Sequence, residues 1–149
     1  MNAERCQEPT SVIVCGVDGS GESRRVAGVA AELSGSLGAQ LVLVTVVSVA
    51  QSPAATPAEQ LEHDECVARR ALLQELKQEE GLTEADDVVG VGSPAGALVE
   101  VAIARGAELL VVGTRGRGPL KAAVLGSVSH DVMEKAPCPV VVVPSRHGA

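Results

Sequence analysis

The chain has 149 residues, a formal net charge of −7 at pH 7, and no Phe, Tyr or Trp. This length favours one domain, which we place at residues 11–145 between flexible tails at 1–10 and 146–149. The acidic charge and the lack of rings for stacking bases argue against nucleic-acid binding. No stretch is apolar enough to span a membrane and no secretory signal is visible, so we expect a cytoplasmic protein without membrane partners.

The four cysteines form no C-x-x-C pair, and no histidine stands at ligand spacing beside them. The sequence therefore predicts no zinc site. Cys15 lies in an apolar run and is predicted to be a small buried hydrophobic residue. A redox role for Cys6 or Cys66 stays open.

Five short runs rich in valine predict strands. Their apolar residues do not alternate with polar ones, which is typical of strands covered on both faces in a parallel sheet. The predicted strands are Val12–Val17, Leu41–Val47, Val88–Val91, Leu109–Val112 and Val140–Val143.

Helical periodicity fills the intervals between these runs. Apolar residues spaced three and four apart give each helix one buried stripe. The predicted helices are Ser23–Leu37, Pro57–Glu80, Pro94–Arg105 and Ser127–Lys135. Their predicted inward-facing residues are Val26, Val29, Ala30, Leu33 and Leu37, then Leu61, Ala68, Leu72 and Leu76, then Ala95, Leu98, Val99, Ala102 and Ile103, and finally Val128 and Val132.

Residues that begin and end helices stand at the expected places. Ser20 or Ser23 is expected to cap the first helix, which Gly38 ends, and Pro94 suits the first turn of the third. The strict alternation of strands and helices predicts a doubly wound α/β sheet with right-handed crossovers. Ligands bind such sheets beyond the carboxyl ends of the strands, so the loops after the first, second and fourth strands are candidates.

The loop after the fourth predicted strand carries Gly113, Gly116, Gly118 and Gly126 within fourteen residues. Glycine allows another group to approach the backbone, and successive N–H groups can surround an anion. The loop ends where a predicted helix begins, and a helix N-terminus offers free N–H groups and a favourable dipole to phosphate. The sequence thus indicates an anion site.

Side chains around this loop strengthen that interpretation. Arg115, Arg117 and Lys121 supply positive charge, and Ser127 and Ser129 supply hydroxyl groups. The alternative is a glycine-rich surface loop whose cations simply point into solvent.

The glycine spacing resembles the G-x2-G-x9-G-[ST] motif of the ATP-binding branch of the universal stress protein family. Gly113, Gly116, Gly126 and Ser127 meet every fixed position. Further stretches similar to that family lie at 17–20, 91–94 and 136–144, so the resemblance covers roughly residues 11–144. Pro119 departs from the small residue more common there.

The resemblance implies a five-stranded, mainly parallel sheet with strand order 3-2-1-4-5 and helices on both faces, as in the adenine-nucleotide alpha-hydrolase-like fold. It also implies a homodimer formed through the last strand, that is through Val140, Val141, Val142 and Val143. The alternative is that a neighbouring loop covers this edge.

The resemblance further implies a role for individual residues. Asp18 would contact the adenosine and Val46 would meet adenine through its backbone, while Gly16 would permit close approach beside the first strand. The phosphate-binding residues would be Gly113, Gly116, Gly126 and Ser127, with Arg115, Arg117, Gly118, Val128 and Ser129 beside them. Simpler structural roles stay open, since Asp18 can cap a turn and Val46 can be ordinary core.

Other nucleotide and catalytic motifs are not supported. Residues 90–95 fit GxGxxA, but the next predicted strand does not end in the acidic residue of a dinucleotide site. Neither a GxxxxGK[ST] loop nor a GxSxG elbow occurs.

Our leading hypothesis is a dimeric regulatory sensor that binds ATP with Mg²⁺, or ADP, AMP or cyclic AMP. A second is a slow ATPase or autophosphorylating enzyme, in which Asp18 holds Mg²⁺ and Ser127 or Ser129 accepts phosphate. A third is a structural dimer that binds no nucleotide.

Overall fold

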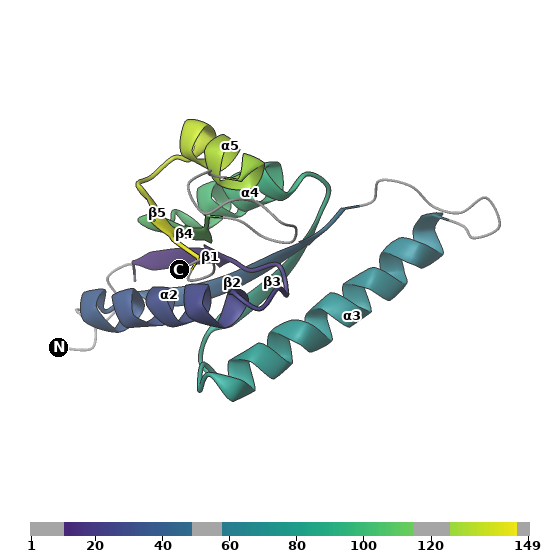
Figure 1. Cartoon of the computed structure of the whole chain (residues 1–149), viewed down its shortest axis with the longest axis horizontal. Helices are drawn as coiled ribbons and strands as arrows, with labels where there is room; N and C mark the ends of the chain where they lie inside the picture. The colour runs from purple at the N-terminus through teal and green to yellow at the C-terminus, as the bar shows by residue number, and fades with distance from the viewer. Residues whose placement is uncertain (1–10, 49–57, 115–125, 146–149) are drawn as a thin grey trace, which may run out of the picture.

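Five parallel strands form one sheet in a computed structural model that describes residues 11–48, 58–114 and 126–145. The strand order is β3-β2-β1-β4-β5, as the sequence predicted (Figure 1). The strands are β1 (Val12–Gly16), β2 (Gln40–Val47), β3 (Asp86–Val91), β4 (Leu109–Gly113) and β5 (Val140–Val143).

In the described part of the chain, four helices cover the two faces of this sheet, as Figure 1 shows. They are α2 (Ser23–Leu37), α3 (Ala58–Glu79), α4 (Pro94–Arg105) and α5 (Ser127–Lys135). Helices α2 and α3 pack on one face, and α4 and α5 pack on the other. Among the described helices, none has both the length and the apolar composition that crossing a membrane requires.

The central strands are buried on both sides, which explains their uninterrupted valine runs. Ile13 and Cys15 of β1 face α2, whereas Val12 and Val14 face α4. Cys15 is fully buried, as predicted. The predicted doubly wound α/β fold is confirmed.

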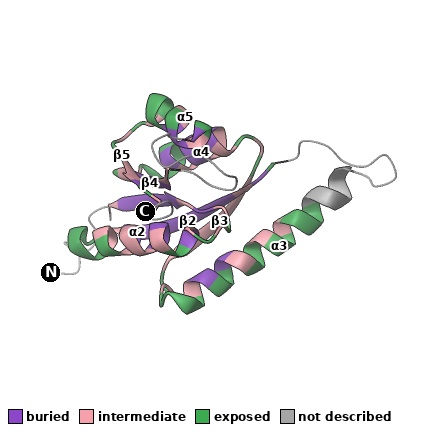
Figure 2. Cartoon of the chain, viewed as in Figure 1, coloured by how far each residue is buried: buried purple, intermediate pink, exposed green. Residues whose placement is uncertain are grey.

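Three residues predicted to face the core are exposed instead (Figure 2). Leu37 and Ile103 lie in the last turns of α2 and α4, and they are 54% and 62% exposed. Ala68 of α3 is also exposed, because the stripe that α3 buries runs through Leu73 and Leu76 and is rotated away from it.

The helix ends follow local backbone chemistry. Gly38 closes α2 with a positive φ of 64°. Pro94 occupies the first turn of α4, where the Ser93 side chain accepts a hydrogen bond from the Gly96 N–H. The predicted serine cap of α2 is wrong: Glu22 holds the N-cap position, and no side chain makes the capping bond.

Candidate functional site

A cavity of about 530 Å³ opens at the carboxyl ends of β1, β2 and β4. Gly16, Val46 and Gly113, the last or nearly last residues of these strands, line it. β1 lies at the centre of the sheet between β2 and β4, and the chain leaves its end to form α2 on one face, whereas β4 leads to α5 on the other. The cavity therefore occupies the switch point where doubly wound sheets hold their ligands.

The turn between β1 and α2 forms one rim of the cavity. Asp18 Oδ1 accepts hydrogen bonds from the Ser20 N–H at 2.9 Å and from the Ser23 hydroxyl at 3.2 Å. Ser23 Oγ in turn accepts from the N–H of Gly19 at 3.0 Å. Ser23 is buried and its hydroxyl is bonded to this turn, which explains why Ser23 does not cap α2. The Asp18 carboxylate is thus held at the rim in one orientation.

The end of β2 and the start of α4 form an apolar wall. Val44, Val46 and Leu98 line this part of the cavity. A Cβ on Gly16 would lie 2.9 Å from both methyl carbons of Leu98, so the close approach that Gly16 permits is to α4. The wall suits the flat apolar face of a ring better than a charged group.

The start of α5 forms the opposite side. Gly126 holds the N-cap position without a side-chain cap, and Gly126, Ser127 and Val128 line the cavity. The Gly126 N–H donates to the Thr114 carbonyl at 2.6 Å, which joins the two ends of the intervening loop. A helix N-terminus that opens on a cavity is a favourable position for an anion.

Ser129 also lines the cavity, but its hydroxyl donates to the Gly126 carbonyl at 3.0 Å and is buried. The hydroxyl proton is therefore engaged within α5, and the exposed Ser127 is the better hydroxyl donor to a ligand. The predicted site residues Arg115, Gly116, Arg117 and Gly118 lie outside the described residues.

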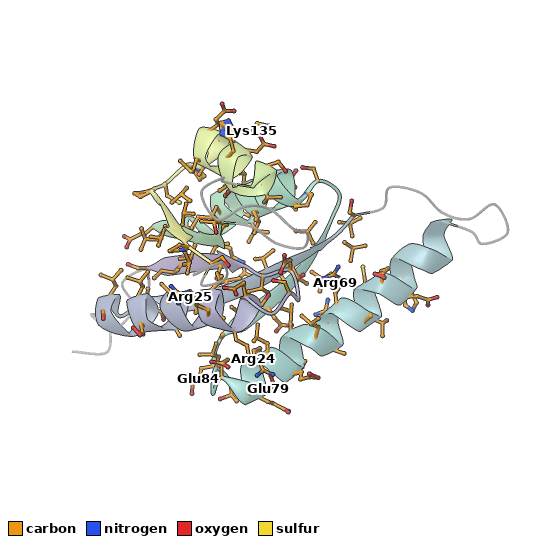
Figure 3. All side chains as sticks on the ribbon, in the orientation of Figure 1. Arg24, Arg25, Arg69, Glu79, Glu84 and Lys135 are labelled. Atoms are coloured by element: carbon orange, nitrogen blue, oxygen red, sulfur yellow. The ribbon has the colours of Figure 1, made fainter. Side chains whose placement is uncertain are left out.

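Helix α3 contributes two residues that the sequence analysis did not single out. Glu65 and Arg69 both line the cavity, and Arg69 Nη1 donates to the Asp18 carbonyl at 2.9 Å. Figure 3 shows Arg69 on the middle of this helix. The sequence signal that could have indicated Arg69 is its spacing from the residues that α3 buries. Arg69 stands three and four residues before the partly buried Leu72 and the fully buried Leu73, so it lies near the packed side of the helix.

Residues 10–144 match the sequence model of the universal stress protein family. The chain belongs to this family. A relative from Thermus aquaticus, "Universal stress protein in QAH/OAS sulfhydrylase 3′region", is 34% identical over 136 residues, which cover 88% of this chain and 96% of the relative.

Solved structures of universal stress proteins resemble the fold as well. One, a universal stress protein in complex with cAMP, is 28% identical with a TM-score of 0.66, covering 91% of this chain and 98% of that one. UspA from Lactobacillus plantarum has a TM-score of 0.76 at 21% identity, covering 92% of this chain and 99% of its own.

In this universal stress protein, the described residues to which the family resemblance pointed for nucleotide binding all line the cavity, together with residues that it did not indicate, such as Glu65 and Arg69. Gly16, Asp18 and Val46 stand on one side, and Gly113, Gly126, Ser127, Val128 and Ser129 stand on the other. Within the described part of the chain, no three Asp, Glu, His or Cys side chains come together as a metal site.

Proposed function

We propose that this universal stress protein binds an adenine nucleotide in the cavity at the carboxyl ends of β1, β2 and β4. The observation that carries the proposal is that the uncapped N-terminus of α5 opens on the same cavity as Asp18 and Val46. One end thus offers N–H groups to phosphate, and the other offers a carboxylate and an apolar wall to a nucleoside. The relative solved with cAMP, at 28% identity, supports an adenine ligand.

The proposed orientation follows from charge. Phosphates lie toward Gly113, Gly126 and Ser127, and Gly116 and the adjoining cations complete this end through the family motif. Asp18 accepts hydrogen bonds from ribose hydroxyls or adenine N–H groups, while Val46 meets the base through its backbone. Among adenine nucleotides we propose ATP, because the loop offers several donors to phosphate.

Mg²⁺ would accompany ATP. Asp18 is the carboxylate best placed to contribute, but its Oδ1 already accepts two hydrogen bonds. Mg²⁺ commonly keeps several waters and binds through one or two carboxylates plus phosphate oxygens. A single Asp18 oxygen fits that pattern, and most ligands would come from the nucleotide and from water.

The proposed role is that of a dimeric cytoplasmic sensor in the stress response. β5 lies at the edge of the sheet, and among the described strands it pairs only with β4. An apolar edge strand of this kind favours pairing with a second copy. β4 pairs with β5 along its length and ends at the cavity. One strand therefore connects the proposed nucleotide site with the proposed dimer edge.

Absorbance gives a direct first test. The chain has no Phe, Tyr or Trp, so it absorbs very little near 280 nm. A natively purified sample with a peak near 260 nm carries nucleotide, which chromatography of the heat-released material identifies as adenine nucleotide or as contaminating nucleic acid. Calorimetric titration with ATP, ADP, AMP and cyclic AMP, each with and without Mg²⁺, then ranks the ligands.

Gly116→Glu tests the phosphate end. A carboxylate in the loop repels phosphate, so ATP binding should be lost while circular dichroism stays native. Gly35→Glu is the matched control, because it adds the same charge at an exposed position of α2 with open space around it. Normal ATP binding by Gly116→Glu would contradict the proposal, as would a native chain that binds none of the four ligands.

A further inference from the structure

The N-terminal half of α3 stands beside the proposed ligand cavity. In Figure 1 this half extends away from the sheet, beyond the end of β2. The C-terminal half is packed, with Leu73 fully buried and Leu76 nearly so (Figure 2). Between the two halves, Glu65 and Arg69 are one helical turn apart and both line the cavity. The helix therefore brings charged side chains to the cavity, beside the turn that carries Asp18.

The position of Arg69 is fixed by the turn that also holds Asp18. Its Nη1 donates to the Asp18 carbonyl, and Leu72, three residues later, packs on the same turn. A Cβ on Gly19 would lie only 2.9 Å from Leu72 Cδ1, so α3 and the turn are in direct contact. Arg69 is thus held at the cavity wall.

The guanidinium of Arg69 makes no ion pair within the described part of the chain. Among the other described arginines, Arg24 pairs with Glu79 (Figure 3), Arg70 with Asp87 and Arg105 with Asp86, whereas Arg25 Nε donates to the Pro144 carbonyl. Arg69 instead has one carbonyl acceptor and retains its charge, its planar face and further N–H donors.

Charge decides which part of a nucleotide this group meets. Asp18, Glu22 and Glu65 line the cavity, and Arg69 is the single cation among the described lining residues. Asp18, whose carbonyl Arg69 contacts, and Glu65, one helical turn from Arg69, place two carboxylates beside the guanidinium and disfavour phosphate on this side. The base and ribose, which are uncharged, belong here, and the phosphates belong at the start of α5.

We propose that Arg69 is a ligand-binding residue whose guanidinium lies against the adenine ring. This inference rests on the proposed function and extends it. A purine held in a protein commonly stacks on an aromatic side chain, and this chain has none. A planar guanidinium is the other side chain that stacks on such rings, and its charge adds a cation–π attraction. Arg69 replaces the missing aromatic side chain.

The test compares three ligands that divide a nucleotide into its parts: adenosine, AMP and ribose 5-phosphate. Arg69→Gln removes the charge but keeps an N–H donor for the Asp18 carbonyl. We expect its Kd to rise about tenfold for both adenosine and AMP, and to stay unchanged for ribose 5-phosphate. Calorimetry or ligand-detected NMR measures all three.

Arg70→Gln is the matched control, because Arg70 is the next residue on the same helix and pairs with Asp87 instead of lining the cavity. It should bind all three ligands as the native chain does. Arg69→Met repeats the comparison without any side-chain donor, and urea unfolding confirms that each variant is folded.

Three results would overturn the assignment. Weaker binding of AMP and ribose 5-phosphate with unchanged adenosine would place Arg69 at the phosphate. Equal weakening of all three would make Arg69 a positioning residue that acts through Asp18, and unchanged binding of all three would remove it from the site. A native chain that binds none of adenosine, AMP and ATP would overturn the proposed function together with this inference.

Discussion

The Ser23 hydroxyl donates to the Asp18 carboxylate at 3.2 Å and at the same time accepts from the Gly19 N–H at 3.0 Å. One buried hydroxyl therefore closes the turn after β1 and orients the carboxylate that we assign to the nucleoside. It also accepts from the Asp18 N–H at 3.3 Å. The geometry of the cavity rim depends on this side chain.

Ser23→Ala removes the acceptor for these two N–H groups. These hydrogen bonds are partly buried, and each contributes about 0.5–1.5 kcal/mol, so the free energy of unfolding should fall by about 1–3 kcal/mol. Urea denaturation measures the loss. Ser36→Ala, at an exposed position of the same helix, is the control and should change stability by less than about 0.5 kcal/mol. Equal stability of the two variants would show that the turn does not need the hydroxyl.

Thr45 differs from Ser23 because its buried hydroxyl has no hydrogen-bond partner among the described residues. Thr45 is only 1% exposed in β2. Valine has nearly the same shape without the hydroxyl, so Thr45→Val should raise the free energy of unfolding by about 1 kcal/mol. Thr45→Ser, which keeps the hydroxyl and loses the methyl group, should lower it. A clear loss of stability in Thr45→Val would reveal a bound water that satisfies the hydroxyl.

Burial raises the pKa of the Cys15 thiol from 9.0 to about 12. Below about pH 9 the thiol is neutral in both the folded and the unfolded chain, so its contribution to stability is complete there. Between about 9 and 12 the unfolded chain releases the proton first, and stability falls by about 1.4 kcal/mol for each tenfold drop in proton concentration. Cys15→Ala should lack this fall in alkaline urea titrations.

The same burial should protect Cys15 from alkylation at pH 8. Cys66 lies half-buried on α3 and is the internal comparison. Peptide mapping after brief treatment with N-ethylmaleimide should find Cys66 modified well before Cys15. Equal rates of modification would mean that β1 opens readily in the native state.

Val142→Pro tests the proposed dimer. The carbonyls of Pro139 and Val143 accept from the N–H groups of Leu110 and Thr114, so the alternate residues Val140 and Val142 direct their backbone groups to the outer edge of β5. Proline at 142 removes an outward N–H without removing a bond to β4. Light scattering should give the mass of one chain, whereas Val142→Thr should remain dimeric. A native chain that is monomeric at high concentration would contradict the dimer proposal.

Much of the fold could be predicted because local signals coincide with it. The bounds of α2, α4 and α5 agree with prediction, and glycine or proline stands beside each of these helices. The starts of β2 and β3 were predicted too late. Gln40 and Asp86 are polar, and they join the sheet through backbone pairing, which a hydropathy pattern does not register.

The residues gathered at the cavity could be predicted where they follow strands or stand at the start of α5. Asp18, Val46 and Gly113 stand at strand ends, and topology alone brings these together. Arg69 comes from the middle of α3, away from any strand end. Whether Arg69 reaches the cavity depends on how Leu73 and Leu76 set the rotation of α3 about its own axis. Tertiary packing of that kind leaves no local sequence motif.

Helix α3 is fastened at one end. Leu73, Leu76 and the Lys77–Asp87 ion pair hold its C-terminal half to the sheet, and the Arg69 bond to Asp18 is a contact nearer the N-terminus. Amide hydrogens along the helix should therefore exchange at graded rates, slowest near Leu73 and faster toward His63. A ligand that contacts Arg69 would slow amide exchange in the N-terminal half alone. Exchange in the C-terminal half would then measure the stability of the fold, and exchange in the N-terminal half would measure the occupancy of the cavity.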